Sequence, residues 1–295
     1  MIFTTTRVRF PSGSDVLVGD LHQPQGQDAT SATTIVIVTG SWTTVKEQQA
    51  DFYARRLAAA GLTTLVFDFR GFGQSEGNPR CWENPARKVE DIRAAVSFAA
   101  SQGYTRIGAL GICASAGYQA VNVADDQRVC SLALVAPWLH NREHVAPYYG
   151  GEAGVSDRID MSRAAAARYA ETGEVSYIPT ISTTDESAAM FGPFDYYLDP
   201  QRGDIPEWDK RIAVMSWEPW LTFNPIDSAS KVTVPVHMVH SRDGAVPDGA
   251  QLFFDALPGP KHVDWLPGTQ LDFYDQPTQV DPAVAAVVEH FRHTL

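Results

Sequence analysis

Arg106-Ile-Gly-Ala-Leu-Gly-Ile-Cys-Ala-Ser-Ala-Gly-Tyr118 is the stretch that decides the fold. Its apolar run from Ile107 to Ile112 predicts a buried strand, and a helix is expected from about Ala114. Between them the chain must turn sharply, and small residues on both sides allow strand and helix to approach closely. A strand-to-helix turn of this kind raises one side chain to the carboxyl edge of a parallel sheet, where a nucleophile can stand.

Two registers of this turn fit the sequence. In the frame Gly111-Ile-Cys-Ala-Ser115 the raised residue is Cys113, and in the frame Cys113-Ala-Ser-Ala-Gly117 it is Ser115. We favour Cys113, because Gly111 stands directly at the end of the apolar run, where the strand must bend. Ser115 then falls in the first helical turn, where serine is ordinarily a cap-region residue. A lone cysteine is more often an inert buried thiol, but a cysteine at such an elbow is expected to be reactive.

Strand and helix patterns alternate on both sides of the elbow. The expected elements are a hairpin around residues 11–15, strands at 34–40, 62–68, 107–112, 130–136, 234–240 and 261–266, and helices at 45–60, 85–101, 114–124, 248–256 and 281–293. This alternation predicts a mostly parallel sheet with right-handed crossovers. A nucleotide-binding fold shares the pattern, but no Gly-x-Gly-x-x-Gly follows the first buried strand and no Walker-type loop occurs.

The alternation is interrupted between residues 139 and 230. This stretch is aromatic and punctuated by proline and glycine, and helices are expected at residues 163–172 and 209–217. We therefore expect a lid (residues 139–230) inserted into a core formed by residues 1–138 and 231–295. Some of its aromatic side chains are expected to line an apolar pocket for organic acyl or aromatic groups.

Length and composition narrow the functional classes. A chain of 295 residues fits one large α/β domain with an insertion or two small domains, and its net charge of −12 disfavours nucleic-acid binding. The three cysteines imply no disulfide framework and suit the reducing cytoplasm. Neither a signal peptide nor an apolar run that could span a bilayer is visible. We expect a cytoplasmic protein acting on a small-molecule substrate, with no nucleic acid, membrane, metal or other cofactor; a homodimer is compatible with the sequence.

Several motifs together resemble the α/β-hydrolase family. Asp68-Phe-Arg-Gly-Phe-Gly-Gln-Ser75 resembles its structural turn, and the elbow resembles the cysteine version seen in dienelactone-hydrolase-like proteins. Val45-Lys-Glu-Gln48, Gly111-Ile-Cys-Ala-Ser115 and Asp272-Phe-Tyr-Asp275 together resemble a bacterial subgroup of that family. The resemblance implies the α/β-hydrolase fold, a mostly parallel doubly wound sheet with an inserted helical lid.

The resemblance also implies an acid and a base beside Cys113. The acid position, after the strand that follows the lid, is Asp243, although an aspartate before glycine is also a common turn residue. The base position, in the loop after the last strand, holds Gln270 instead of histidine. Glutamine cannot accept and return a proton near neutral pH. A thiol needs less help from a base than a hydroxyl does, so a cysteine nucleophile is coherent with this replacement.

His140 is the best substitute base. It lies just past the strand expected at residues 130–136, which neighbours the elbow strand in this fold, so we expect it at the same sheet edge as Cys113. The alternative is a solvated or core histidine at the lid entrance. His140-Asn-Arg-Glu-His144 also matches a short zinc-peptidase pattern, but Pro137 precedes it closely and no third ligand is evident.

The remaining candidate residues would hold the oxyanion or contact the substrate. The backbone N–H groups of Ala114 and of Ser41 or Trp42 are the expected oxyanion donors, and Trp138 and Gln270 are expected beside them. The sequence thus predicts hydrolysis of an ester, thioester or lactone through Cys113. Gln270 favours an alternative, a non-hydrolytic descendant that is a cyclase, a lyase or a small-molecule binder.

Overall fold

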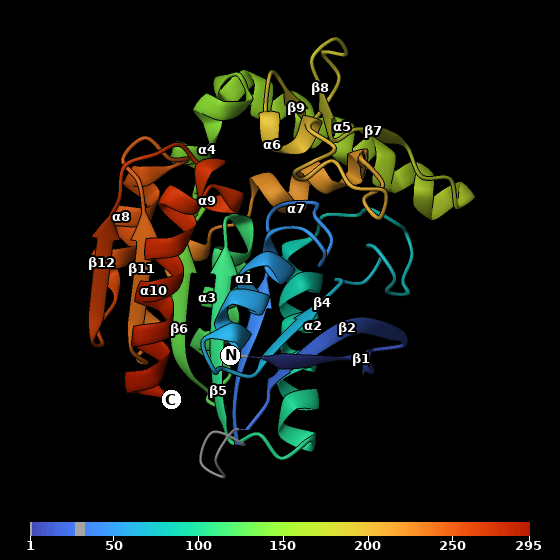
Figure 1. The fold of residues 1–295 in the computed structure, drawn as a ribbon. Helices are drawn as coiled ribbons and strands as arrows, with labels where there is room; N and C mark the ends of the chain where they lie inside the picture. The colour runs from blue at the N-terminus through green and yellow to red at the C-terminus, as the bar shows by residue number, and fades with distance from the viewer. Residues whose placement is uncertain (1, 27–32) are drawn as a thin grey trace.

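An eight-stranded sheet forms the centre of the protein (Figure 1). The computed structural model describes residues 2–26 and 33–295. The strands of the sheet are β1 (Phe3–Ser12), β2 (Asp15–Pro24), β3 (Thr34–Thr39), β4 (Thr64–Phe67), β5 (Arg106–Ile112), β6 (Val129–Val135), β11 (Val236–His240) and β12 (Lys261–Trp265). Their spatial order is β1-β2-β4-β3-β5-β6-β11-β12.

Strand directions follow from the connections. All neighbours from β4 to β12 are parallel, whereas β2 runs antiparallel to β4 and pairs with β1 as a hairpin. Every residue of β3 and β4 is buried, as expected for strands covered on both faces. The predicted α/β-hydrolase fold, with its mostly parallel sheet, is confirmed.

Helices cover both faces of the sheet. The helices that flank it are α1 (Gln49–Ala59), α2 (Pro85–Ser101), α3 (Ala114–Asp125), α8 (Pro247–Ala256) and α10 (Pro277–Thr294). α1 and α10 pack together on one face, while α2 and α3 pack together on the other (Figure 1). The sequence places the starts of α1 and α10 within about four residues. Both α2 and α10 begin at a proline, a residue suited to the first helical turn.

The segment between β6 and β11, residues 136–235, adds no strand to the main sheet. Its described elements are α4 (Arg142–Val145), η2 (Ala146–Tyr149), α5 (Gly151–Thr172), β7 (Tyr177–Pro179), β8 (Ile181–Ser182), β9 (Met190–Phe191), α6 (Asp195–Leu198), β10 (Arg211–Ala213), η3 (Val214–Ser216), α7 (Trp217–Leu221) and η4 (Pro225–Lys231). Figure 1 shows it lying over the carboxyl ends of the parallel strands. We call it the intervening segment; that it acts as a lid stays a prediction.

The helices expected within this segment meet different outcomes. The helix at residues 163–172 is the second half of α5. The prediction of a helix at residues 209–217 is wrong, because β10 occupies part of that stretch and pairs antiparallel with β7. None of the helices in residues 2–26 and 33–295 combines the length and apolar character needed to cross a bilayer.

Candidate active site

The turn between β5 and α3 is sharp, and its backbone is strained at Cys113. Cys113 adopts φ 56° and ψ −120°, a strained conformation for a non-glycine residue. Gly111 is required just before it, because an added Cβ would lie 2.7 Å from the Ala116 Cα and from the Ser115 carbonyl oxygen. The strained backbone presents the Cys113 side chain at the end of β5.

Ser115 points elsewhere. It is fully buried, and its hydroxyl donates a hydrogen bond to the carbonyl oxygen of Gly40 at the end of β3. Its side chain does not belong to the cleft lining described below, whereas that of Cys113 does. The geometry therefore favours the register with Cys113 at the raised position.

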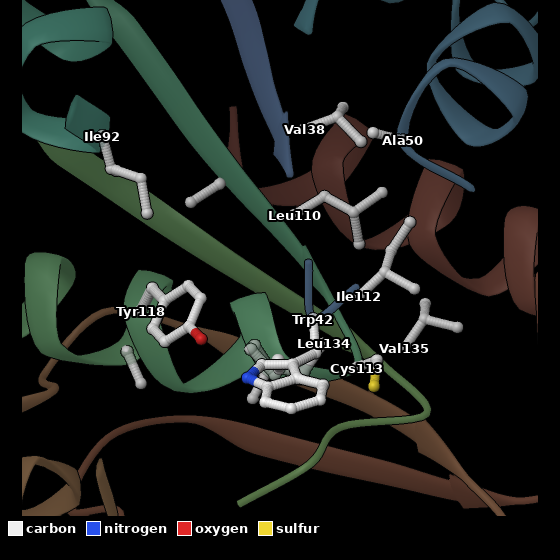
Figure 2. Packing of buried hydrophobic residues seen from close by; sticks show 14 of the residues in the cluster. Val38, Trp42, Ala50, Ile92, Leu110, Ile112, Cys113, Tyr118, Leu134 and Val135 are labelled. Atoms are coloured by element: carbon white, nitrogen blue, oxygen red, sulfur yellow. The ribbon is translucent and has the colours of Figure 1, made fainter. Parts of the chain in front are cut away.

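A cleft of about 600 Å³ opens at the carboxyl edge of the sheet, between the strand ends and the intervening segment. The sequence-predicted residues that line it are Ser41, Trp42, Cys113, Ala114, Trp138, Asp243 and Gln270. Figure 2 shows the Cys113 sulfur at the margin of the packed core, beyond Ile112 and near the Trp42 ring. The side chain of Cys113 is only 4% exposed, yet the cleft reaches it.

The loop after β3 is held by a buried ion pair. Thr43 has a φ of 60°, and its backbone N–H donates to Glu83 Oε2 at 2.8 Å. Lys88 Nζ lies 2.7 Å from the other carboxylate oxygen, and Tyr118 Oη donates to that same oxygen at 2.7 Å. Because these groups are buried, the interactions fix the loop that presents Ser41 and Trp42 to the cleft.

Two buried tyrosines bring hydroxyl groups to this loop. Ser41 Oγ lies 2.9 Å from Tyr197 Oη and 3.3 Å from Tyr274 Oη. Tyr274 comes from the short helix α9 (Asp272–Asp275), and Tyr197 comes from α6 of the intervening segment. Both tyrosines line the cleft beside Cys113.

Tyr274 also interacts with the thiol. Burial, followed by the electrostatic effects of Cys113 and Tyr197, holds the pKa of Tyr274 well above its usual value. Burial likewise raises the pKa of Tyr197. Both phenols are therefore protonated near neutral pH, so they act as hydrogen-bond donors and not as bases.

Gln270 occupies the expected base position and is bound to backbone on two sides. Its Nε2 donates to the carbonyl oxygen of Ala136 at 2.7 Å, and its Oε1 accepts from the N–H of Ala245 at 3.0 Å. A weaker contact of 3.5 Å joins Nε2 to Tyr274 Oη. The amide thus connects the end of β6 to the loop after β11.

Asp243 lies in that loop, and it is exposed at the cleft. Its backbone N–H donates to Ser241 Oγ at 3.0 Å, so the turn is held locally. Gln270 directs its amide group to Ala136 and away from a pairing with this carboxylate. No histidine is found among the described residues that line the cleft. Asp243 and Cys113 therefore share it without an imidazole between them.

His140 lies elsewhere than expected. It is fully buried, and it is not among the cleft-lining residues. Its Nδ1 accepts from Trp138 Nε1 at 3.0 Å, so Nε2 carries the proton and donates to the Trp220 carbonyl oxygen at 3.0 Å. Burial lowers the pKa of His140 to about 4. With both ring nitrogens engaged, His140 is a core histidine that supports the cleft wall through Trp138.

Aromatic side chains from the intervening segment form the opposite wall. Tyr148, Phe191 and Phe194 line the cleft and are at least 36% exposed. Tyr148 packs on Trp138 with ring centroids 4.9 Å apart, and its hydroxyl accepts a hydrogen bond from the Val246 N–H at 2.9 Å. An apolar wall of this kind suits an organic acyl or aromatic group.

The sheet order and the flanking helices define an α/β-hydrolase-fold protein. The sequence profile of the family described as "Serine aminopeptidase, S33" matches residues 30–174. Among solved structures, that of hypothetical protein PA2218 from Pseudomonas aeruginosa has a TM-score of 0.84 at 22% identity, covering 99% of this chain and 94% of that one. The α/β hydrolase GrgF from Penicillium sp. has a TM-score of 0.81 at 19% identity, with 99% of both chains covered. These likenesses show the α/β-hydrolase fold.

Relatives are also found by sequence. The uncharacterized protein YcjY of Escherichia coli (strain K12) is 28% identical over 93% of both chains. The thiohydrolase aneE of Aspergillus aculeatus is 26% identical over 78% of this chain and 76% of its own. The structure of a dienelactone hydrolase from Anabaena variabilis shares the fold, with a TM-score of 0.60 at 13% identity and 99% of both chains covered.

Sequence reasoning missed the role of Tyr274 and did not single out Tyr197. Tyr274 stands four residues after Gln270, within Asp272-Phe-Tyr-Asp275. Four residues is one helical turn, so a turn of helix after Gln270 places both side chains on one side. That spacing is the signal that identifies Tyr274. Tyr197 is separated from Ser41 by 156 residues, and no local pattern connects them.

Proposed function

We propose that the protein hydrolyses an ester, thioester or lactone of a small organic acyl or aromatic substrate, with the Cys113 thiol as nucleophile. The observation that carries the proposal is the position of that thiol. It stands on a positive-φ elbow and borders a cleft of about 600 Å³. Strained, over-determined backbone of this kind is concentrated at functional sites.

In the proposed reaction the Cys113 sulfur attacks the acyl carbonyl carbon, and the bond from that carbon to the leaving oxygen or sulfur breaks. The backbone N–H groups of Ala114 and of Ser41 or Trp42 stabilise the oxyanion. The Tyr274 hydroxyl, which lines the same cleft as Cys113, is proposed to donate a hydrogen bond to the sulfur as negative charge develops on it during the attack. Water then attacks the acyl-cysteine, which releases the acid and restores the thiol.

Asp243 is the proposed proton acceptor. Its carboxylate is exposed at the same cleft, so a water between Asp243 and Cys113 carries the proton from the thiol to the carboxylate and later to the leaving group. Of the described residues that line the cleft, Asp195, Asp243 and Asp272 are acidic and Arg202 is basic. Arg202 is engaged by Asp275 through two hydrogen bonds of 2.7 and 2.6 Å.

This charge distribution supports a neutral substrate. A free anion would be repelled by the aspartates, and Arg202 is already paired with Asp275. An ester or thioester group carries no such charge. The relative named as a thiohydrolase supports a thioester among the candidates. Residues 139–230 are proposed to act as a lid, because Tyr148, Phe191 and Phe194 from this stretch form the apolar wall over the thiol.

Gln270 supports a second candidate function. Its amide is bound to Ala136 and Ala245 and cannot shuttle protons, which suits a cyclase, a lyase or a small-molecule binder that never deacylates with water. In that case the elbow and the aromatic wall hold a ligand, and hydrolysis is absent.

A screen with p-nitrophenyl esters, acyl thioesters and lactones tests the proposal. We expect turnover, a mass increase of one acyl group on Cys113 in the intact protein, and loss of both in Cys113→Ala. Cys130→Ala is the matched control, since that thiol is half-buried on β6 and does not line the cleft. Full turnover by Cys113→Ala on every accepted substrate contradicts the proposal. No turnover, with a ligand-induced rise in Tm, supports the second candidate.

A further inference from the structure

Two histidines and an aspartate meet on the outer strands of the sheet, apart from the cleft. His237 in β11 and His262 in β12 are register partners in a parallel pair, so their side chains project from the same face, one beside the other. Their ring centroids are 4.9 Å apart. Asp264 stands two residues after His262 and so projects from that same face.

We propose that His237, His262 and Asp264 bind a divalent transition-metal ion of the zinc class. One donor atom from each of the three side chains can be chosen so that all lie within 4.8 Å of one another. Zinc takes imidazole nitrogen and carboxylate oxygen at about 2.0–2.2 Å, so the donors around one ion stand roughly 3–3.5 Å apart. Side-chain rotation is needed to bring the three donor atoms from within 4.8 Å of one another to that spacing.

The carboxylate already lies between the two imidazoles. Asp264 Oδ2 is 2.8 Å from His237 Nε2, and Oδ1 is 3.1 Å from His262 Nε2. An ion takes the place of the hydrogen-bonded protons, each imidazole then keeps its proton on Nδ1, and the carboxylate supplies negative charge.

The inner side of the cluster is packed and its outer side is open. His290 of α10 packs edge-on against the His237 ring, with centroids 5.6 Å apart, and its Nε2 lies 2.9 Å from Ser131 Oγ. His290 thus limits the orientations of His237. On the outer side, His262 is 66% exposed and Asp264 is 37% exposed. An ion can therefore enter from solvent and keep water as its remaining ligand.

Metal binding here joins the outermost strand to its neighbour. β12 lies at the edge of the sheet and pairs with β11 (Figure 1). The loops that follow these strands carry Asp243 and Gln270, whereas none of the three proposed ligands lines the cleft. The inference is therefore independent of the proposed function. Because the site exists in the folded state, bound metal stabilises that state.

Calorimetric titration of the full chain, without a polyhistidine tag, with ZnCl₂ tests the proposal. We expect one ion per chain and a rise in Tm with added zinc. His262→Ala is the variant of choice because His262 is exposed, and it should weaken binding about tenfold or more. Asp264→Asn, which keeps the side-chain shape, should also weaken binding. His293→Ala, an exposed histidine outside the cluster, is the matched control and should bind as the unaltered chain does.

Cobalt titration separates this site from the thiol. The expected Co²⁺ complex has d–d absorption without a thiolate-to-metal band, and Cys113→Ser leaves it unchanged. Absence of zinc binding, equal affinity in His262→Ala, or a thiolate band that disappears in Cys113→Ser would each overturn the proposal.

Discussion

Gln270 Nε2 donates a hydrogen bond of 2.7 Å to the carbonyl oxygen of Ala136. Ala136 has a φ of 42° at the end of β6, so the amide holds a strained carbonyl in place. Its Oε1 accepts from Ala245 in the neighbouring loop. The position that the family resemblance assigns to a base thus performs a structural task, while remaining part of the cleft wall.

Replacement of Gln270 by histidine tests what the imidazole would add. In Gln270→His we expect the rate of deacylation to rise by about tenfold to a hundredfold above the new imidazole's pKa, because a positioned general base contributes at least that much. The measurement is the acyl-enzyme lifetime by rapid-quench mass spectrometry. Gln270→Ala is the companion variant. It should lose about 1–3 kcal/mol of stability, because backbone groups of Ala136 and Ala245 lose their partner. A deacylation rate unchanged in Gln270→His would argue against water attack on an acyl-cysteine.

Tyr274→Phe should slow the acylation step while leaving the fold intact. The proposed hydrogen bond to a sulfur that gains negative charge during the attack would be worth about 1.5–3 kcal/mol, which corresponds to roughly tenfold to a hundredfold in rate. Pre-steady-state release of p-nitrophenol measures this step. Tyr196→Phe provides the comparison, since Tyr196 is buried against the Tyr274 ring at 5.1 Å but does not line the cleft. Equal effects of the two substitutions would mean that Tyr274 acts only through packing.

Ser115→Ala should retain turnover. The Ser115 hydroxyl is committed to the Gly40 carbonyl inside the protein, so its removal costs stability, about 1 kcal/mol, without removing a reacting group. Steady-state rates and Tm on the same preparation separate these effects. Abolished turnover in a variant that keeps its Tm would restore the register with Ser115 as the nucleophile.

Glu83 should be among the most sensitive buried positions. Glu83→Ala leaves the Lys88 ammonium buried without its counter-ion, and breaking such a pair costs about 3–5 kcal/mol. The double variant Glu83→Gln/Lys88→Met should lose less, because no unpaired charge remains. Urea unfolding measures both. Glu218→Gln breaks an exposed pair with Arg163 and is expected to change stability by about 1 kcal/mol or less. A cost for Glu83→Ala similar to that for Glu218→Gln would contradict the buried-pair account.

The stability of the folded protein should decrease as the pH is lowered, because His140 is buried in its neutral form. Its folded-state pKa is lowered to about 4 by burial, while the unfolded chain takes up this proton near pH 6.5. The stabilising contribution is therefore complete above about pH 6.5 and is lost as pH falls toward 4, at up to about 1.4 kcal/mol per pH unit. His140→Gln should reduce that slope in urea unfolding measured between pH 7 and 4.5. An unchanged slope would mean that His140 is charged in the folded state.

The parts of the fold that depend on local patterns were predictable from the sequence. The elbow strand expected at residues 107–112 is β5, and Gly111 marked the bend because only a glycine fits there. The helix expected at residues 209–217 failed for a non-local reason. Backbone partners about thirty residues upstream, in β7, hold residues 211–213 extended. Helical spacing carries no information about such a partner.

The candidate site divides in the same way. Cys113 follows from its place after the elbow strand, whereas Asp243 and Gln270 were assigned by the family resemblance. All three line the cleft, because parallel strands bring their carboxyl ends to one edge. His140 also follows a strand, yet its ring is buried in the core, where it is hydrogen-bonded to the Trp138 side chain and to the Trp220 carbonyl oxygen. Trp220 lies eighty residues further along the chain, so no local sequence pattern predicts its hydrogen bond with His140.

The hydrogen bond from the Val246 N–H to Tyr148 Oη ties the roof of the cleft to the loop that carries Asp243. A motion that separates Tyr148 from this loop must break the bond, so through it a movement of the intervening segment would be coupled to the loop that carries Asp243. Val246 also holds a φ of 51°, which the loop can relax once it is released. Hydrogen exchange at the Val246 amide therefore reports how often this hydrogen bond breaks.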